Sequence, residues 1–276
     1  MSNAVEPRGL SKVGLQINGW LVYLFFSAPI VLLVIFSFSE SRNVGKWGGF
    51  TLSWYEQFID SSNARNALEN SIKIAIVVTI ISVILGTMSA LALERFTFKG
   101  KRVFDALLYL PIIIPDVTMA VMLLLFFGEF FEILDNLFGL QLRKGFWSIS
   151  ISHIAFNISF VSVVVRARLA GMSTDLEEAA VDLYASRWKA FRHVTFPQIL
   201  PGIAGGALLA MTLSLDDVVI TQFVAGPGGT TLPVYVFGLI RKGVTPLINS
   251  ISVIMLVSSM LLVGLSLLAE RTRRGG

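Results

Sequence analysis

The stretch Glu177-Glu178-Ala179-Ala180-Val181-Asp182-Leu183-Tyr184 is followed, after a basic and aromatic run, by Val194-Thr195-Phe196-Pro197. This polar segment lies between two long apolar segments. Thr174 and Glu177 have the spacing of a capping box, in which the side chains of the N-cap and of the third helical residue each accept a backbone N–H bond. A helix is therefore expected to begin at this point of the chain.

One face of this expected helix is thin and another is acidic. Ala179 and Ala180 leave a side that could lie close against another protein surface. Glu178 and Asp182 are four residues apart, share a face and repel each other weakly unless a basic partner lies opposite. A solvated loop helix with an ordinary acidic face is the alternative interpretation. The spacing to Pro197 between two apolar segments favours a helix that contacts a partner.

The composition predicts an all-α protein that crosses a membrane several times. Hydrophobic residues make up 54% of the chain and charged residues 14%. Six segments are long enough to cross a hydrocarbon core of about 30 Å. They lie near Trp20–Phe38, Ile74–Leu93, Ala106–Phe127, Phe146–Val165, Ile199–Val224 and Leu247–Ala269. We expect one transmembrane domain over residues 1–276, with an inner loop at about 166–198 and a kink in the third span at Pro111 and Pro115.

The distribution of Lys and Arg predicts that both termini are cytoplasmic. With the N-terminus inside, the inner segments hold fourteen of the 22 Lys and Arg residues, and the positive-inside rule favours that orientation. These are Arg8, Lys12, Arg95, Lys99, Lys101, Arg102, Arg166, Arg168, Arg187, Lys189, Arg192, Arg271, Arg273 and Arg274. The net charge of +4 is thus a topology signal, and we expect membrane lipid around the chain and no nucleic-acid partner.

Several kinds of chemistry are absent from the sequence. The chain has no cysteine, which excludes disulfides and thiol catalysis, and its two histidines, His153 and His193, do not suggest a metal site. His153 is interpreted as a hydrogen-bonding side chain that packs in the fourth span. No G-x-x-x-x-G-K-[ST] phosphate loop occurs, so we expect no catalytic residue and no cofactor in this chain.

Three carboxylates within the expected spans are candidates for substrate contact. Asp116 falls near mid-membrane in the third span, whereas Asp216 and Asp217 fall in the outer third of the fifth. A charge at the centre of a membrane helix costs roughly 2.5–3.5 kcal/mol on insertion scales, so it is rarely kept without a partner or a water-filled route. Carboxylates at two depths suit an elongated cation with an amine at each end.

Each carboxylate also has a structural alternative. Asp216 and Asp217 could lie at a water-exposed mouth or cap the following turn, and Asp116 could bond carbonyls freed by a kink or the side chain of Thr118. On a regular helix only one of Asp216 and Asp217 can face a given pathway. The sequence leaves open which of the two does so.

The polar stretch resembles the EAA loop of binding-protein-dependent ABC importer permeases. Glu178-Ala179-Ala180 matches the first part of that motif, and Val194 and Pro197 fall at the expected spacing. Tyr184 stands where the family usually has Gly, and Phe196 replaces Leu. The resemblance implies a loop that docks on an ATPase subunit, and the residues that it assigns to this coupling are Glu177, Glu178, Ala179, Ala180, Asp182, Tyr184 and Pro197.

Further segments are similar to the spermidine/putrescine importer permeases of the PotC/PotI type. They are Pro115-Asp116-Val117, Leu213–Ile220, Phe223–Pro227 and Thr231-Leu232-Pro233. The likeness implies a six-helix, type I (MetI-like) permease of a bacterial inner membrane that moves small cations. It also implies a sister permease, two ATPase subunits that bind ATP and Mg, and an extracytoplasmic binding protein. Permeases for iron, phosphonates and opines are similar to these proteins.

Two other classes of function remain as alternatives. An ion-coupled secondary transporter could use the intramembrane aspartates, but it would leave the EAA-like loop unexplained. An intramembrane aspartyl protease needs two aspartates on different spans, but its usual Tyr-Asp and Gly-x-Gly-Asp surroundings are missing.

Overall fold

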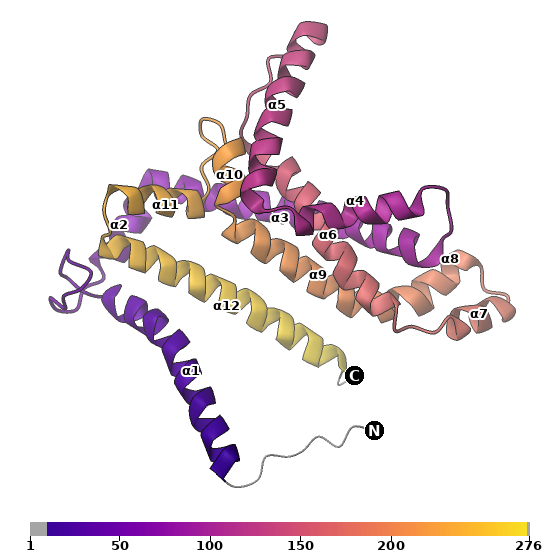
Figure 1. Cartoon of the computed structure of the whole chain (residues 1–276), viewed down its shortest axis with the longest axis horizontal. Helices are drawn as coiled ribbons and strands as arrows, with labels where there is room; N and C mark the ends of the chain where they lie inside the picture. The colour runs from indigo at the N-terminus through magenta and orange to yellow at the C-terminus, as the bar shows by residue number, and fades with distance from the viewer. Residues whose placement is uncertain (1–9, 275–276) are drawn as a thin grey trace. The chain divides into compact units, whose positions relative to one another are not determined.

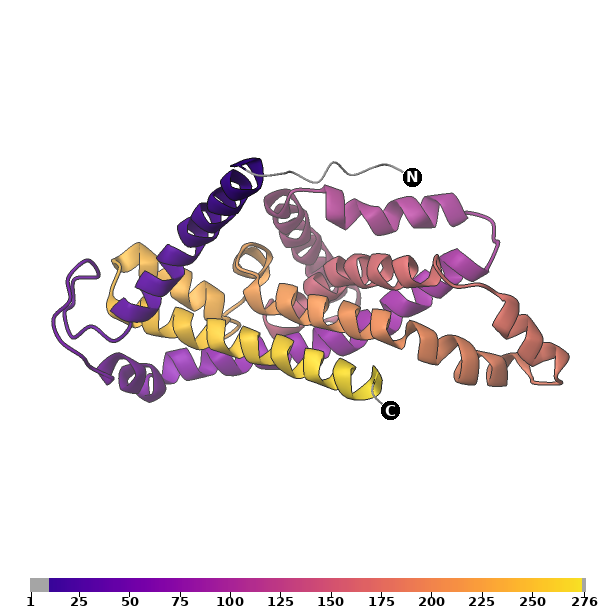
Figure 2. The same ribbon diagram turned by 90° about the horizontal axis from the view of Figure 1, so that it is seen from below.

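Helices account for all the regular structure of the described residues apart from one isolated bridge between Ser39 and Phe50. The computed structural model describes residues 10–274 and excludes the side chains of residues 10, 11, 262 and 265–274. The elements, drawn in Figures 1 and 2, are α1 (Leu10–Phe36), α2 (Ser53–Asp60), α3 (Ser62–Arg95), α4 (Lys101–Ile113), α5 (Asp116–Phe138), α6 (Phe146–Leu169), α7 (Asp175–Asp182), α8 (Arg187–Ala190), the π-helix η1 (Phe191–Thr195), α9 (Phe196–Asp216), α10 (Val219–Val224), α11 (Leu232–Lys242) and α12 (Pro246–Arg274).

The chain divides into two compact units. The first contains the chain up to Asp60 together with Leu239–Val257, and the second contains Ser61–Gly238 and the chain after Val257. In the first unit, Trp54 Nε1 donates to the carbonyl of Ser39 at 2.8 Å, which ties α2 to the segment after α1. The polar loop that contains Glu178 and the three candidate carboxylates, Asp116, Asp216 and Asp217, all lie in the second unit. The expectation of a single domain stays a prediction.

The core of the second unit forms where α3, α6 and α9 pack together. Gly86 of α3 and Gly206 of α9 both face Val161 of α6. A Cβ at position 86 would lie 2.7 Å from the Val161 Cβ, so only glycine permits this approach. The small-residue stripe Gly202, Gly206, Ala210 and Ser214 therefore packs on a helix of this same chain, where small residues let membrane helices approach closely.

Gly86→Ala is expected to lower the thermal stability of the purified protein. The added methyl group would overlap Val161 and the carbonyl of Ile158, and overpacking of this kind costs about 1–3 kcal/mol. Gly205→Ala is the matched control, because its Cβ would meet only ordinary contact with Val164 at 3.7 Å. Thermal denaturation in detergent measures both variants, and equal midpoints would contradict the close approach.

Within the described part of the chain, five helices are long and apolar enough to cross a membrane, and α12 contains a shorter apolar part at Pro246–Leu261. The second, fourth and sixth predicted spans lie within α3, α6 and α12, and the first matches α1 except for its last two residues. The orientation stays a prediction. Residues 1–9, 275 and 276, which include Arg8 of the charge count, lie outside the described residues.

The third and fifth predicted spans are wrong as continuous helices. The third span breaks between α4 and α5, because Pro115 forces the preceding Ile114 into an extended conformation (φ −70°, ψ 132°). The expected kink is thus a full interruption, and α5 projects away from α3, α6 and α9 (Figure 1). The fifth span breaks at Asp217, which is also extended (φ −69°, ψ 124°) and separates α9 from α10.

Candidate functional site

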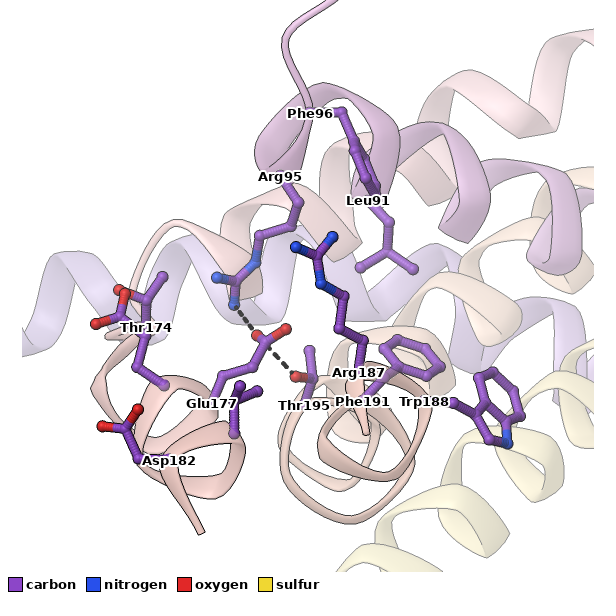
Figure 3. Close-up of a pocket in the computed structure, with 12 residues that line it drawn as sticks. Leu91, Arg95, Phe96, Thr174, Glu177, Asp182, Arg187, Trp188, Phe191 and Thr195 are labelled. Carbon is purple, nitrogen blue, oxygen red and sulfur yellow. Dashed lines mark hydrogen bonds and ion pairs between the residues drawn. The ribbon is translucent and has the colours of Figure 1, made fainter. Parts of the chain in front are cut away.

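The acidic helix of the loop exists, but the predicted capping box does not form. Helix α7 begins after Thr174, whose side chain makes no capping bond, while Ser173 Oγ accepts the backbone N–H of Asp175 at 3.1 Å. The Glu177 carboxylate accepts instead from Thr195 Oγ1 at 3.0 Å and lies 3.4 Å from Arg95 Nη2 (Figure 3). A tertiary contact therefore replaces the local one, because a single carboxylate cannot reach both places.

Helix α7 ends in a Schellman motif centred on Tyr184. The backbone N–H of Tyr184 donates to Val181 at 3.0 Å, and that of Ala185 donates to Ala180 at 3.0 Å. Tyr184 has φ of 64°, the left-handed conformation that glycine adopts without strain, and its side chain is 99% exposed. The sharp turn is thus kept although tyrosine occupies the position.

Tyr184→Gly is expected to preserve uptake and to stabilise the loop by about 1 kcal/mol, because a non-glycine residue in the left-handed region costs roughly 1–2 kcal/mol. Amide hydrogen exchange at Leu183 to Ser186, compared with the unmodified protein, measures the change. Faster exchange in the variant would show that the phenol ring itself holds the turn.

A groove of about 800 Å³ lies between α7, the segment α8–η1 and the end of α3 (Figure 3). Its lining is both charged and apolar: Leu91, Arg95, Phe96, Thr174, Glu177, Glu178, Val181, Asp182, Arg187, Trp188, Phe191 and Thr195. Of the lining residues, Phe96 is 62% exposed and Trp188 is 67% exposed. Large apolar side chains exposed on a surface among polar groups are typical of sites that contact a protein, a membrane or a ligand.

The coupling residues named from the sequence differ in their surroundings. Glu178 and Asp182 are exposed at the groove, whereas Glu177 turns inward. Of the two alanines, Ala179 is exposed and Ala180 is half-buried. Pro197 is the second residue of α9, just after the π-helical turn η1, in which the N–H of Phe196 reaches the carbonyl of Phe191.

Ion pairs tie this loop to the helical core. The last two residues of α3 point to different elements, since Arg95 reaches α7 and Glu94 accepts from Arg166 of α6 at 2.8 Å. Arg166 also donates to Asp105 of α4 at 2.5 Å. All these groups are partly exposed, so each pair contributes about 1 kcal/mol or less, but together they link four elements at one end of the second unit.

The candidate substrate carboxylates have unequal surroundings. Asp116 is the first residue of α5 and is exposed, and it makes no hydrogen bond or ion pair with the described residues. Its position at the start of a helix suits a negative charge. Asp216, the last residue of α9, is exposed as well. Both are therefore open to a cation at the point where an apolar segment breaks.

Asp217 is engaged within the protein. Its carboxylate accepts the N–H of Thr221 at 2.7 Å, the hydroxyl of Thr221 at 2.7 Å and the N–H of Ile220 at 3.3 Å. These bonds cap α10, as one alternative interpretation anticipated. Asp216 and Asp217 do not share one regular helix, because α9 ends between them. Their relative orientation therefore differs from the one expected from helical geometry.

His153 of α6 is a further hydrogen-bond partner of Asp217. The imidazole is 2% exposed, with Nε2 3.1 Å from Asp217 Oδ2 and Nδ1 3.0 Å from Ser214 Oγ. The packing role assigned from the sequence agrees with this burial, but the link to Asp217 was not anticipated, because 64 residues separate the two. Among the described residues, no three His, Cys, Asp or Glu side chains are grouped to hold a metal ion.

Comparison with known proteins assigns the chain to a family. Residues 82–271 match the model of the binding-protein-dependent transport system inner membrane component. The chain belongs to this family. It is 36% identical over 255 residues to the spermidine/putrescine transport system permease protein PotC of Escherichia coli K12, covering 92% of this chain and 93% of the relative.

A second relative agrees with this assignment, and a solved structure shares the fold. The putrescine transport system permease protein PotI of Escherichia coli K12 is 39% identical over 237 residues, covering 86% of this chain and 83% of the relative. A chain of a bacterial ABC transporter involved in the import of alginate superposes with a TM-score of 0.77 at 17% identity, covering 95% of each chain, which shows the shared fold. This binding-protein-dependent permease is a multi-pass protein of the inner membrane.

Proposed function

We propose that this permease carries polyamines such as spermidine and putrescine from a binding protein across the inner membrane, as the translocation subunit of an ATP-driven importer. The observation that carries the proposal is the pair Asp116 and Asp216, two exposed carboxylates at the breaks of two apolar segments. Carboxylates in such segments are costly and are kept where they meet a cation or line a water-filled route. The names of the two relatives support the same substrate class.

ATP hydrolysis is assigned to partner subunits. The sequence contains no phosphate-binding loop, and the groove at α7 has the mixed apolar and charged lining of a protein-binding surface. We assign ATP and Mg to two ATPase subunits, one on this chain and one on a sister permease, with both termini of this chain in the cytoplasm. Glu178 and Asp182 would face the ATPase, whereas Glu177 would brace α7 from within.

Reconstitution of the complete importer into proteoliposomes tests the proposal. Uptake of radiolabelled spermidine should require ATP and the binding protein, and it should not respond to a proton or sodium gradient alone. Uptake driven by a gradient without ATP would identify an ion-coupled transporter. Failure of spermidine and putrescine to compete, with competition by ferric iron, an aminophosphonate or an opine, would assign another small solute to the same permease.

A further inference from the structure

The break between α9 and α10 is held by a buried imidazole. Both ring nitrogens of His153 have partners, and the partners lie on opposite sides of the break, with Ser214 in α9 and Asp217 and Thr221 beyond it. Ser214 and Thr221 are buried, and the side chain of Asp217 is 16% exposed. One side chain of α6 therefore contacts both flanks of the interruption.

Hydrogen-bond chemistry determines the roles in this group. An ionised carboxylate only accepts, so His153 Nε2–H donates to Asp217 Oδ2, as do the N–H and the hydroxyl of Thr221. With its proton on Nε2, the imidazole accepts the Ser214 hydroxyl at Nδ1. Oδ2 of Asp217 thus has three donors and Oδ1 has one, so a substrate amine would have to share this carboxylate with groups of the protein.

Helix α10 is also fixed to α6 at its far end. Ser148 Oγ donates to the carbonyl of Val224 at 2.8 Å. Ile220 and Val224 are buried in a cluster that includes Phe127 of α5. The short helix is therefore attached to α6 at both ends, while Asp216, immediately before the break, stays exposed.

We propose that His153 is a positioning residue for translocation: by binding Asp217 it fixes the break so that Asp216 alone of the pair meets a substrate ammonium group. This inference rests on the proposed cationic substrate. In a general packing role, His153 would affect transport whether or not Asp216 is present. In the proposed role, its effect on transport depends on the carboxylate of Asp216.

The first test compares His153→Leu and His153→Gln in the complete reconstituted importer. Leu removes the hydrogen bonds of both ring nitrogens at a similar volume, whereas the Gln amide can still donate to Asp217. We expect His153→Leu to raise the KM for spermidine about tenfold, which is about 1.4 kcal/mol, with a nearly unchanged maximal rate. His153→Gln should restore most of the affinity. A fall in maximal rate at unchanged KM would overturn the proposal.

Ser150→Ala is the matched control on the same helix. Its hydroxyl is buried and donates to the carbonyl of Phe146 within α6, so its loss leaves the break untouched. This variant should keep the KM of the unmodified importer. An equal rise in KM for Ser150→Ala would overturn the proposal by showing that any disturbance of α6 has the same effect.

A double-mutant cycle tests the route through Asp216. If His153 acts by placing Asp216, His153→Leu should add little to the KM of the Asp216→Asn importer, because coupled residues give non-additive effects. If the two substitutions raise the KM by factors that multiply in the double variant, the proposal would be overturned.

Amide hydrogen exchange over residues 218–225 gives a readout that does not depend on the substrate. We expect faster exchange at Ile220 and Thr221 in His153→Leu and unchanged exchange in Ser150→Ala. If the unmodified importer does not move polyamines but this difference is found, the proposed substrate fails while the role of His153 in holding the break is supported. Unchanged exchange in His153→Leu would overturn that role whatever the substrate.

Discussion

Glu178→Lys is expected to abolish uptake and to release the ATPase subunits, while the permease still inserts into the membrane. Glu178 is exposed at the groove and stacks with Asp182 on one face of α7, so that face presents two negative charges to a partner. Reversing one of them places like charges against the basic or dipolar surface that receives the helix, and such juxtapositions cost several kcal/mol. Co-purification of the ATPase with tagged permease, together with uptake, is the measurement.

Two control variants separate this effect from other causes. Asp175→Lys makes the same change of charge on the same helix but outside the groove lining, and it should retain the ATPase. Glu177→Gln removes the ion pair with Arg95 without changing the outer face, so it should affect the stability of the loop more than ATPase binding. Normal transport and full ATPase retention in Glu178→Lys would exclude this face from coupling.

Asp116→Asn and Asp216→Asn are each expected to lower polyamine uptake at least about tenfold, equivalent to about 1.4 kcal/mol, in importers that still assemble. Asn is close in size to Asp and keeps hydrogen-bonding groups, so the change tests charge rather than packing. Removing one carboxylate leaves an ammonium group of the substrate without its counter-charge in a partly desolvated route. Initial rates of radiolabelled spermidine uptake in proteoliposomes provide the measurement.

Asp217→Asn serves as the contrast. This carboxylate caps α10 and binds His153, so its neutralisation should weaken the break and lower thermal stability, an effect that the other two variants should not share. Near-normal uptake in both Asp116→Asn and Asp216→Asn would show that these carboxylates do not meet the substrate. The residue-level reason for a cationic substrate would then be lost.

The accuracy of the predicted spans follows from where the apolar runs are interrupted. Ile74–Leu93 contains no proline and no charge, and it lies within α3 as one uninterrupted helix. Ala106–Phe127 contains Pro115, and local backbone chemistry explains why a helix ends there, although a kink was predicted in place of a break. Ile199–Val224 has no proline near its break, and the local sign was an aspartate that could cap a following turn, which the sequence left as an alternative.

In the candidate sites, too, local features could be predicted from the sequence and contacts between distant residues could not. The start of α7 was placed correctly, although the capping box on which that prediction rested does not form. The partner of Glu177 could not be predicted, because Arg95 is distant along the chain and is brought near only when α3 packs beside the loop. Asp217 and His153 were both noted separately, but their contact needs α6 and α9 in place.

Hydrophobic length and motif spacing are local or one-dimensional properties, and they were sufficient for the membrane class, the permease family and the existence of the acidic helix α7. Which carboxylate is bonded and which is exposed depends on tertiary packing. Asp216 and Asp217 are adjacent and chemically identical, yet the second caps α10 through Ile220 and Thr221 and also meets His153, which only the packing of α6 beside these helices brings to it. A hydrogen bond requires its atoms within about 3 Å, and for residues far apart in the chain only the folded helices provide that proximity.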